Sequence, residues 1–89
     1  MFESNLKIKD VKSEIGQLVK SYRKGEKLSM QELAERLELS RITIQNLESG
    51  KNFTIDTLLK VLQYFDMLAA LNDFVKGKRS ENEEVESLY

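Results

Sequence analysis

The feature that most constrains this chain is the absence of proline, combined with the presence of only four glycines in 89 residues. Because proline and glycine are the strongest interruptions of helices, long helical segments can form here with few internal breaks. Helix ends must then be marked by capping side chains and by the glycines, and Gly25, Gly50 and Gly77 fall where apolar periods end. The chain is therefore expected to be largely helical.

The first helix is expected to run from about Asp10 to Lys24, with Asp10 as its cap and Gly25 as its stop. Its apolar residues recur at steps of three and four, which is typical of one face of an amphipathic helix. They are Ile8, Val11, Ile15, Leu18, Val19 and Tyr22.

Two short helices should follow. Ser29 and Glu32 have the spacing of a capping box, which predicts a second helix over about Met30 to Leu37. Its apolar face would consist of Met30, Leu33, Ala34 and Leu37. Ser40 can cap a third helix that Gly50 closes, with Ile44 and Leu47 facing the core. The opposite face of that third helix would carry Arg41, Ile42, Gln45, Asn46 and Ser49.

The last part of the chain predicts two more helices. Thr54 can cap the fourth, whose apolar face would be Ile55, Leu58, Leu59, Leu62 and Phe65. A fifth is suggested by Leu68, Leu71, Phe74 and Val75. Five helices with little indication of strands predict an all-α fold. We expect an N-terminal extension over 1–9, one domain over 10–76 and a charged, disordered tail over 77–89.

Composition excludes several functions. With no cysteine and no histidine, the chain lacks disulfides, the usual zinc ligands and the commonest general base, and its carboxylates are spread over helix faces. We therefore expect no metal, no cofactor and no enzymatic activity. Residues 1–80 hold all fourteen basic groups but only eleven of the fifteen acidic ones, so the folded part is mildly basic. No apolar stretch is long enough to span a membrane, and a cytoplasmic location is expected.

The segment from Leu28 to Lys51 resembles the helix-turn-helix of the lambda-repressor-like Cro/XRE family, within a resemblance that covers about residues 13 to 75. The motif elements that carry it are Leu33-Ala34, Leu39-Ser40, Ile44 and Leu47-Glu48-Ser49-Gly50-Lys51. The resemblance implies a five-helix DNA-binding domain, with double-stranded DNA as partner and the motif formed by the second and third helices. It also implies a repressor that binds a palindromic operator as a homodimer.

Two positions depart from the family pattern. Met30 stands where relatives usually have a glutamine that bonds phosphate, and neighbouring Gln31 could partly substitute for it. Glu38 stands where relatives have glycine in the turn between the two motif helices. Glu38 must therefore adopt a positive φ, which is unfavourable for a side-chain-bearing residue, or force a different turn.

The resemblance assigns roles to the residues on and around the third helix. Arginine can donate to two guanine acceptors, glutamine or asparagine can bridge adenine, and isoleucine can pack on a thymine methyl group. The base-reading residues would be Arg41, Ile42, Gln45 and Asn46. The DNA backbone would be contacted by Gln31, Ser40, Thr43, Lys51 and Asn52. The alternative is an ordinary polar helix surface.

Two further assignments each leave an alternative open. Arg23 and Glu48 match positions that form a partly buried ion pair in relatives, but they could be separate solvated charges. The apolar residues of the fifth helix could pack against the first helix in the core of one chain, or form a dimer interface. Those residues are Leu68, Leu71, Phe74 and Val75.

The region from Asn52 to Gln63 also resembles antitoxins of the HipB type, in which a threonine-rich turn precedes an apolar helix. Such proteins repress their own operon and bind a toxin protein. The sequence therefore favours a DNA-binding repressor, with an antitoxin that binds a protein toxin as the alternative.

Overall fold

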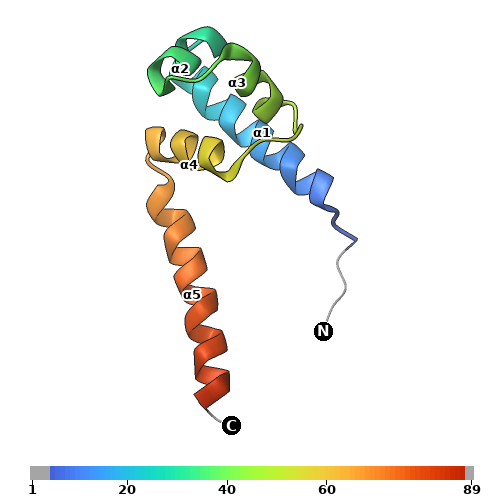
Figure 1. The fold of residues 1–89 in the computed structure, drawn as a ribbon, viewed down its shortest axis with the longest axis vertical. Helices are drawn as coiled ribbons and strands as arrows, with labels where there is room; N and C mark the ends of the chain where they lie inside the picture. The colour runs from blue at the N-terminus through green and yellow to red at the C-terminus, as the bar shows by residue number, and fades with distance from the viewer. Residues whose placement is uncertain (1–4, 88–89) are drawn as a thin grey trace.

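The computed structural model describes residues 5–87 and contains five helices, with no strand in that range. The helices, shown in Figure 1, are α1 (Ile8–Gly25), α2 (Met30–Leu37), α3 (Arg41–Glu48), α4 (Ile55–Tyr64) and α5 (Leu68–Ser87). The all-α prediction with five helices is confirmed. Residues 1–4 of the expected extension and 88–89 of the expected tail lie outside the described residues.

Helices α1 to α4 form the body of the molecule, and α5 leads away from it (Figure 1). Helix α3 packs against both α1 and α2. The core between these helices consists of Val19, Leu28, Leu33, Ala34, Ile44, Leu47, Val61 and Phe65. Five of these side chains are larger than alanine and wholly inaccessible to solvent, so the three short helices gain their stability mainly from this shared core.

Gly16 allows α1 to cross α3 at close range. A Cβ atom at this position would lie 2.7 Å from the carbonyl oxygen of Leu47 and closer still to that of Glu48. Only glycine fits where one helix backbone meets another at this distance. The crossing fixes the end of α3 against the middle of α1.

The predicted N-caps of α2, α3 and α4 are present. The Ser29 hydroxyl accepts from the Glu32 amide at 3.0 Å, and the Ser29 amide donates back to the Glu32 carboxylate at 2.8 Å. The hydrogen bond that the Ser29 amide donates to the Glu32 carboxylate, followed by the Ser29 side chain, holds the pKa of Glu32 below its usual value. Ser40 and Thr54 cap α3 and α4 in the same way, each accepting from the amide three residues on at 3.1 Å.

The turn between α2 and α3 shows which of the two alternatives holds at Glu38, the residue that replaces the family's glycine: it adopts a positive φ. This residue has φ 56° and ψ 42°, which is the left-handed conformation. The following amide, that of Leu39, donates to the Ala34 carbonyl at 2.8 Å and closes the end of α2. The turn thus keeps the geometry that glycine usually provides, with a side chain in place of the glycine hydrogen.

Some local predictions need correction. Helix α1 begins at Ile8, and Asp10 acts from inside its first turn by accepting from the Lys7 amide at 2.9 Å. On α4, Ile55 is 69% exposed, whereas Val61, which the apolar pattern missed, is completely buried. Leu62 and Phe65 of the predicted face are buried, so the core-facing side of α4 is the predicted one shifted toward Val61, on a helix that also contacts α2.

Helix α5 continues beyond Gly77 to Ser87, so the helix boundary expected at Gly77 is not observed. Charged residues support this extension along the exposed helix surface. Lys78 lies 3.4 Å from Glu81, and Arg79 lies 3.5 Å from Glu83. That residues 77–89 form a tail separate from the domain stays a prediction.

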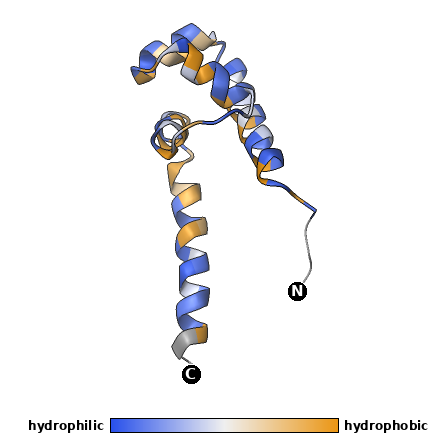
Figure 2. Cartoon of the chain, turned by 45° about the vertical axis from the view of Figure 1, so that its right-hand side comes forward, coloured by the Kyte–Doolittle hydropathy of each residue, from blue (hydrophilic) through white to orange (hydrophobic). Residues whose placement is uncertain are grey.

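The placement of α5 argues against the core-packing alternative. Its main contacts are with α4, and Phe74 and Val75 are 63% and 52% exposed. Leu68 and Leu71, nearer to α4, are half-buried. Figure 2 shows that apolar residues concentrate in the half of α5 next to α4 and charged residues in the far half. None of the described helices is both long enough and apolar enough to cross a membrane.

Candidate nucleic-acid interface

Helices α2 and α3 form a helix-turn-helix in which α3 presents a polar face to solvent. Arg41, Ile42 and Gln45 are exposed on this face, and Asn46 is half-buried beside them. Ile44 and Leu47 on the opposite face are fully buried and hold the helix to the core. The four predicted base-reading residues are thus brought together on one surface of a firmly packed helix.

The exposed face of α3 has donors and an apolar group suited to base edges. The Arg41 guanidinium donates to the Gln45 side-chain oxygen at 3.3 Å, a long bond on the surface that a base could replace. Ile42 is 61% exposed in the middle of this polar face. Arginine, glutamine and isoleucine so arranged match guanine, adenine and the thymine methyl group, respectively.

The start of α3 carries two hydroxyls placed for backbone contact. The Ser40 and Thr43 hydroxyl oxygens lie 2.8 Å apart, and Ser40 also accepts from the Thr43 amide. Ser40 is exposed and Thr43 is half-buried. The positive end of the helix dipole lies at this point, so an anion such as a phosphate is favoured there.

The loop after α3 holds the next pair of predicted backbone contacts. Lys51 and Asn52 are both exposed, and the Lys51 amide donates to the Asn46 carbonyl at 2.9 Å. The Asn52 side-chain oxygen accepts from the Lys12 ammonium at 2.8 Å. The sequence analysis missed Lys12, and no pattern could reveal it because Lys12 precedes Asn52 by forty residues.

Gln31 lies in the first turn of α2, exposed, and its amide group donates to the Glu35 carboxylate at 3.1 Å. Met30, in the glutamine position of relatives, is half-buried and packs against the core. Gln31 would have to leave Glu35, to which it donates at 3.1 Å, to bond a phosphate. The predicted role of Gln31 therefore has weaker geometric support than that of Ser40 or Lys51.

Arg23 and Glu48 join α1 to the end of α3. The Arg23 Nε and Nη2 atoms donate to the two Glu48 carboxylate oxygens at 2.6 and 2.9 Å, and Nη1 donates to the Leu28 carbonyl at 2.7 Å. The side chains are only 8% and 3% exposed, so the alternative of two solvated charges does not hold. The hydrogen bond to Glu48 raises the pKa of Arg23, which stays charged.

No group of acidic residues that could hold a metal ion occurs within the described part of the chain. The α3 surface and its flanking loop offer hydrogen-bond donors, one apolar contact and a helix N-terminus, and groups of these kinds can bind a DNA duplex.

The comparison with known families agrees with this geometry. Residues 16–78 match the family model described as a helix-turn-helix domain, and the chain belongs to this family, which is of the Cro/XRE type. The match spans all of α2, α3 and α4. The protein is thus a helix-turn-helix DNA-binding regulator. A search of curated proteins finds no match to the chain.

Proposed function

We propose that this protein is a sequence-specific repressor that binds a palindromic operator as a homodimer. The observation that carries the proposal is the exposed face of α3, on which Arg41, Ile42 and Gln45 stand together on a helix fixed by the core and by the Arg23–Glu48 pair. A helix held in this way is already ordered, so entering the major groove costs little further conformational entropy of its backbone.

Dimerisation is expected because one helix-turn-helix module makes only a small interface with DNA, and two modules linked by a two-fold axis read both halves of a palindrome. The exposed apolar residues of α5 supply the surface for it, with Phe74 and Val75 the most accessible. A dimer bound over a promoter prevents polymerase from binding, so repression requires no further activity.

The test is selection of bound sequences from a random DNA pool, followed by binding measurements on the selected site and on a scrambled one. Replacing Arg41 by alanine should lower the preference for the selected site by about 1 to 3 kcal/mol, because a guanine would lose its two donors. Lys20→Ala, on the exposed surface of α1, is the matched control. A preference unchanged in the Arg41 variant would contradict base reading by this residue.

The second candidate is an antitoxin that binds a toxin protein and represses its own operon. The observation in its favour is the open apolar groove between α4 and α5, which a protein segment could fill. Its lining residues include Ile55, Leu59, Leu68, Leu71 and Val75. A pull-down with the full chain, run beside the DNA-binding assay, separates the candidates: capture of one stoichiometric partner favours the antitoxin, and self-association alone favours the repressor.

A further inference from the structure

Helix α1 carries an apolar stripe that its own chain covers only in part: Ile15 packs against the core, and the other members are exposed. Ile8, Val11, Ile15, Leu18 and Tyr22 follow one another at steps of three and four, the spacing of a seam between two paired helices. Ile8 is 78% exposed and Val11, Leu18 and Tyr22 are 38 to 42% exposed, while the buried face of α1 lies to one side, at Gly16, Val19 and Arg23. A solvent-exposed apolar stripe of this kind is typical of a protein interface.

Helix α5 carries a second stripe with the same spacing. Leu68, Leu71 and Val75 stand at steps of three and four. Val85 lies fourteen residues, or two periods of seven, beyond Leu71; Lys78, at the position between them, is polar. Val75 and Val85 are each 52% exposed. Both helices therefore present seams that can pair with another helix.

Each stripe has one end close to α4. The Tyr22 ring lies 5.6 Å from that of Phe65, so the C-terminal end of the α1 stripe meets the end of α4. On the other side of α4, Ile55 and Leu59 form an apolar groove with the first turns of α5. Figure 1 shows α1 and α5 diverging on either side of α4.

The turn after α4 directs the chain's own α5 away from α1. Asp66 in this turn has φ 62°, and the Met67 amide donates to the Leu62 carbonyl at 2.7 Å, which closes the end of α4. Leu68 and Leu71 are then anchored along the α4 groove. Helix α5 of the same chain therefore does not cover the α1 stripe.

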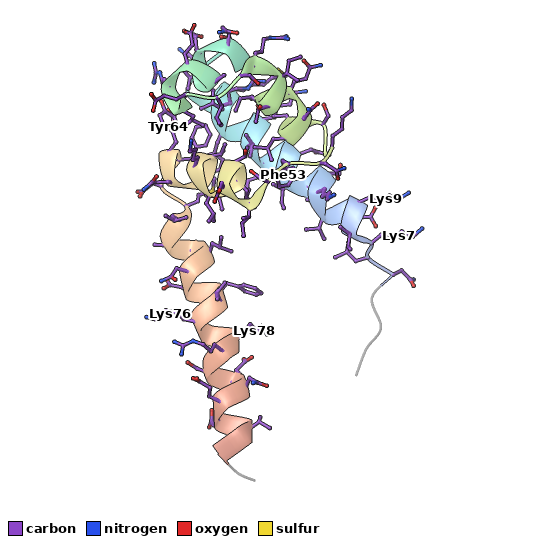
Figure 3. The ribbon with its side chains drawn as sticks, viewed as in Figure 1. Lys7, Lys9, Phe53, Tyr64, Lys76 and Lys78 are labelled. Carbon is purple, nitrogen blue, oxygen red and sulfur yellow. The ribbon has the colours of Figure 1, made fainter. Side chains whose placement is uncertain are left out.

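Charge indicates which helix of a second molecule fits the α1 stripe. The start of α1 carries Lys7, Lys9 and Lys12 against Asp10 and Glu14, so it is net basic. Beyond Arg79, α5 carries Glu81, Glu83 and Glu84, and Glu81 and Glu83 also pair with Lys78 and Arg79 of their own helix. Figure 3 labels Lys7 and Lys9 at the beginning of α1, and Lys76 and Lys78 on α5 before this acidic part. An antiparallel α5 would place its acidic end beside the basic start of α1, which favours this pairing over a parallel one.

We propose that α5 of a second copy lies antiparallel along the α1 stripe, and that the exchange is reciprocal. Val85 then faces Ile8 and Val75 faces Leu18, since each step along one helix matches a step back along the other, while Leu71 stays in the groove along its own α4. A helix of 20 residues spans about 30 Å, long enough to cover the stripe from Ile8 to Tyr22.

This arrangement rests on the dimer of the proposed function but names the surface on the partner that α5 covers. The chain has no cysteine, so single cysteines can be introduced without interference. Leu18→Cys and Val75→Cys variants are mixed as full chains, unfolded, refolded together and oxidised. The expected result is a disulfide-linked heterodimer on a non-reducing gel, because facing seam positions bring Cα atoms within bonding range. Ile8→Cys mixed with Val85→Cys should give the same result.

The matched control is Lys20→Cys mixed with Val75→Cys, because Lys20 is exposed on α1 outside the stripe, and it should give at least tenfold less heterodimer. Circular dichroism and sedimentation of the reduced variants check that they fold and dimerise. A Val75→Cys homodimer without either heterodimer would overturn the proposal in favour of α5 pairing with α5. Cross-linking within single chains of a Leu18→Cys, Val75→Cys double variant, or a wild-type monomer at high micromolar concentration, would also overturn it. DNA is absent throughout, so failure here is distinct from failure to bind an operator.

Discussion

The guanidinium of Arg23 donates to both carboxylate oxygens of Glu48, at 2.6 and 2.9 Å, and thereby joins the last turn of α1 to the last residue of α3. The third donor of the same guanidinium holds the Leu28 carbonyl at the entry to α2. One side chain thus connects α1, the start of the helix-turn-helix and its end. Neither Arg23 nor Glu48 lies on the exposed face of α3, but their pair joins α3 to α1 and so helps to hold that face in its orientation.

Replacing Glu48 by alanine should destabilise the protein by about 3 kcal/mol, because it leaves a nearly buried guanidinium without its counter-charge. Urea unfolding monitored by circular dichroism measures this loss. The exposed pair of Arg79 and Glu83 is the control, and Arg79→Ala should cost no more than about 1 kcal/mol. A double change, Arg23→Met with Glu48→Leu, should be milder than Glu48→Ala alone. Equal effects of the buried and exposed changes would show that the pair is not held away from water.

Gly16→Ala and Gly77→Ala should have opposite effects on stability. At Gly16 the added methyl group collides with the backbone at the end of α3, and a loss of about 2 kcal/mol or more is expected. At Gly77, inside α5, nothing lies within 4 Å, so alanine should stabilise by about 0.5 to 1 kcal/mol through its higher helix propensity. Thermal melting of both variants under one set of conditions tests this. Stabilisation by Gly16→Ala would mean that α1 and α3 do not approach closely.

Glu38→Gly should raise the melting temperature, since Glu38 holds a left-handed φ of 56° that glycine adopts without a steric penalty. A gain of about 0.5 to 1 kcal/mol is expected, after the greater freedom of glycine in the unfolded chain is subtracted. Glu35→Gly, inside α2, is the control and should destabilise by about 1 kcal/mol. If both changes destabilised equally, the turn at residue 38 would not be left-handed.

Lys51→Ala should weaken binding to specific and scrambled DNA alike, because a phosphate contact carries no sequence information. The slope of log affinity against log salt concentration should become shallower by about one. Lys12→Ala should give a smaller, uniform loss, since Lys12 positions Asn52 through their 2.8 Å hydrogen bond. Lys76→Ala on α5, far from α3 in Figure 3, should leave the slope unchanged. A slope unaffected by Lys51→Ala would place that side chain away from the DNA backbone.

The sequence alone determined the number of helices and the N-caps of α2 to α4. Ser29, Ser40 and Thr54 each bond an amide three residues away, so the signal and its effect lie within one turn of chain. The buried side of α3 was predictable in the same way, because Ile44 and Leu47 repeat at helical spacing. The family resemblance added the Arg23–Glu48 pair, which no local pattern indicates.

Tertiary structure decided what local patterns leave open. Val61 is buried and Ile55 exposed because α4 turns toward α2, and Lys12 meets Asn52 because the crossing at Gly16 brings α1 beside the loop after α3. The direction of α5 is set by the turn at Asp66, and this leaves two apolar stripes open that periodicity alone would assign to a core. Periodicity identifies a face that avoids water, but only the packing of distant segments determines which surface covers it.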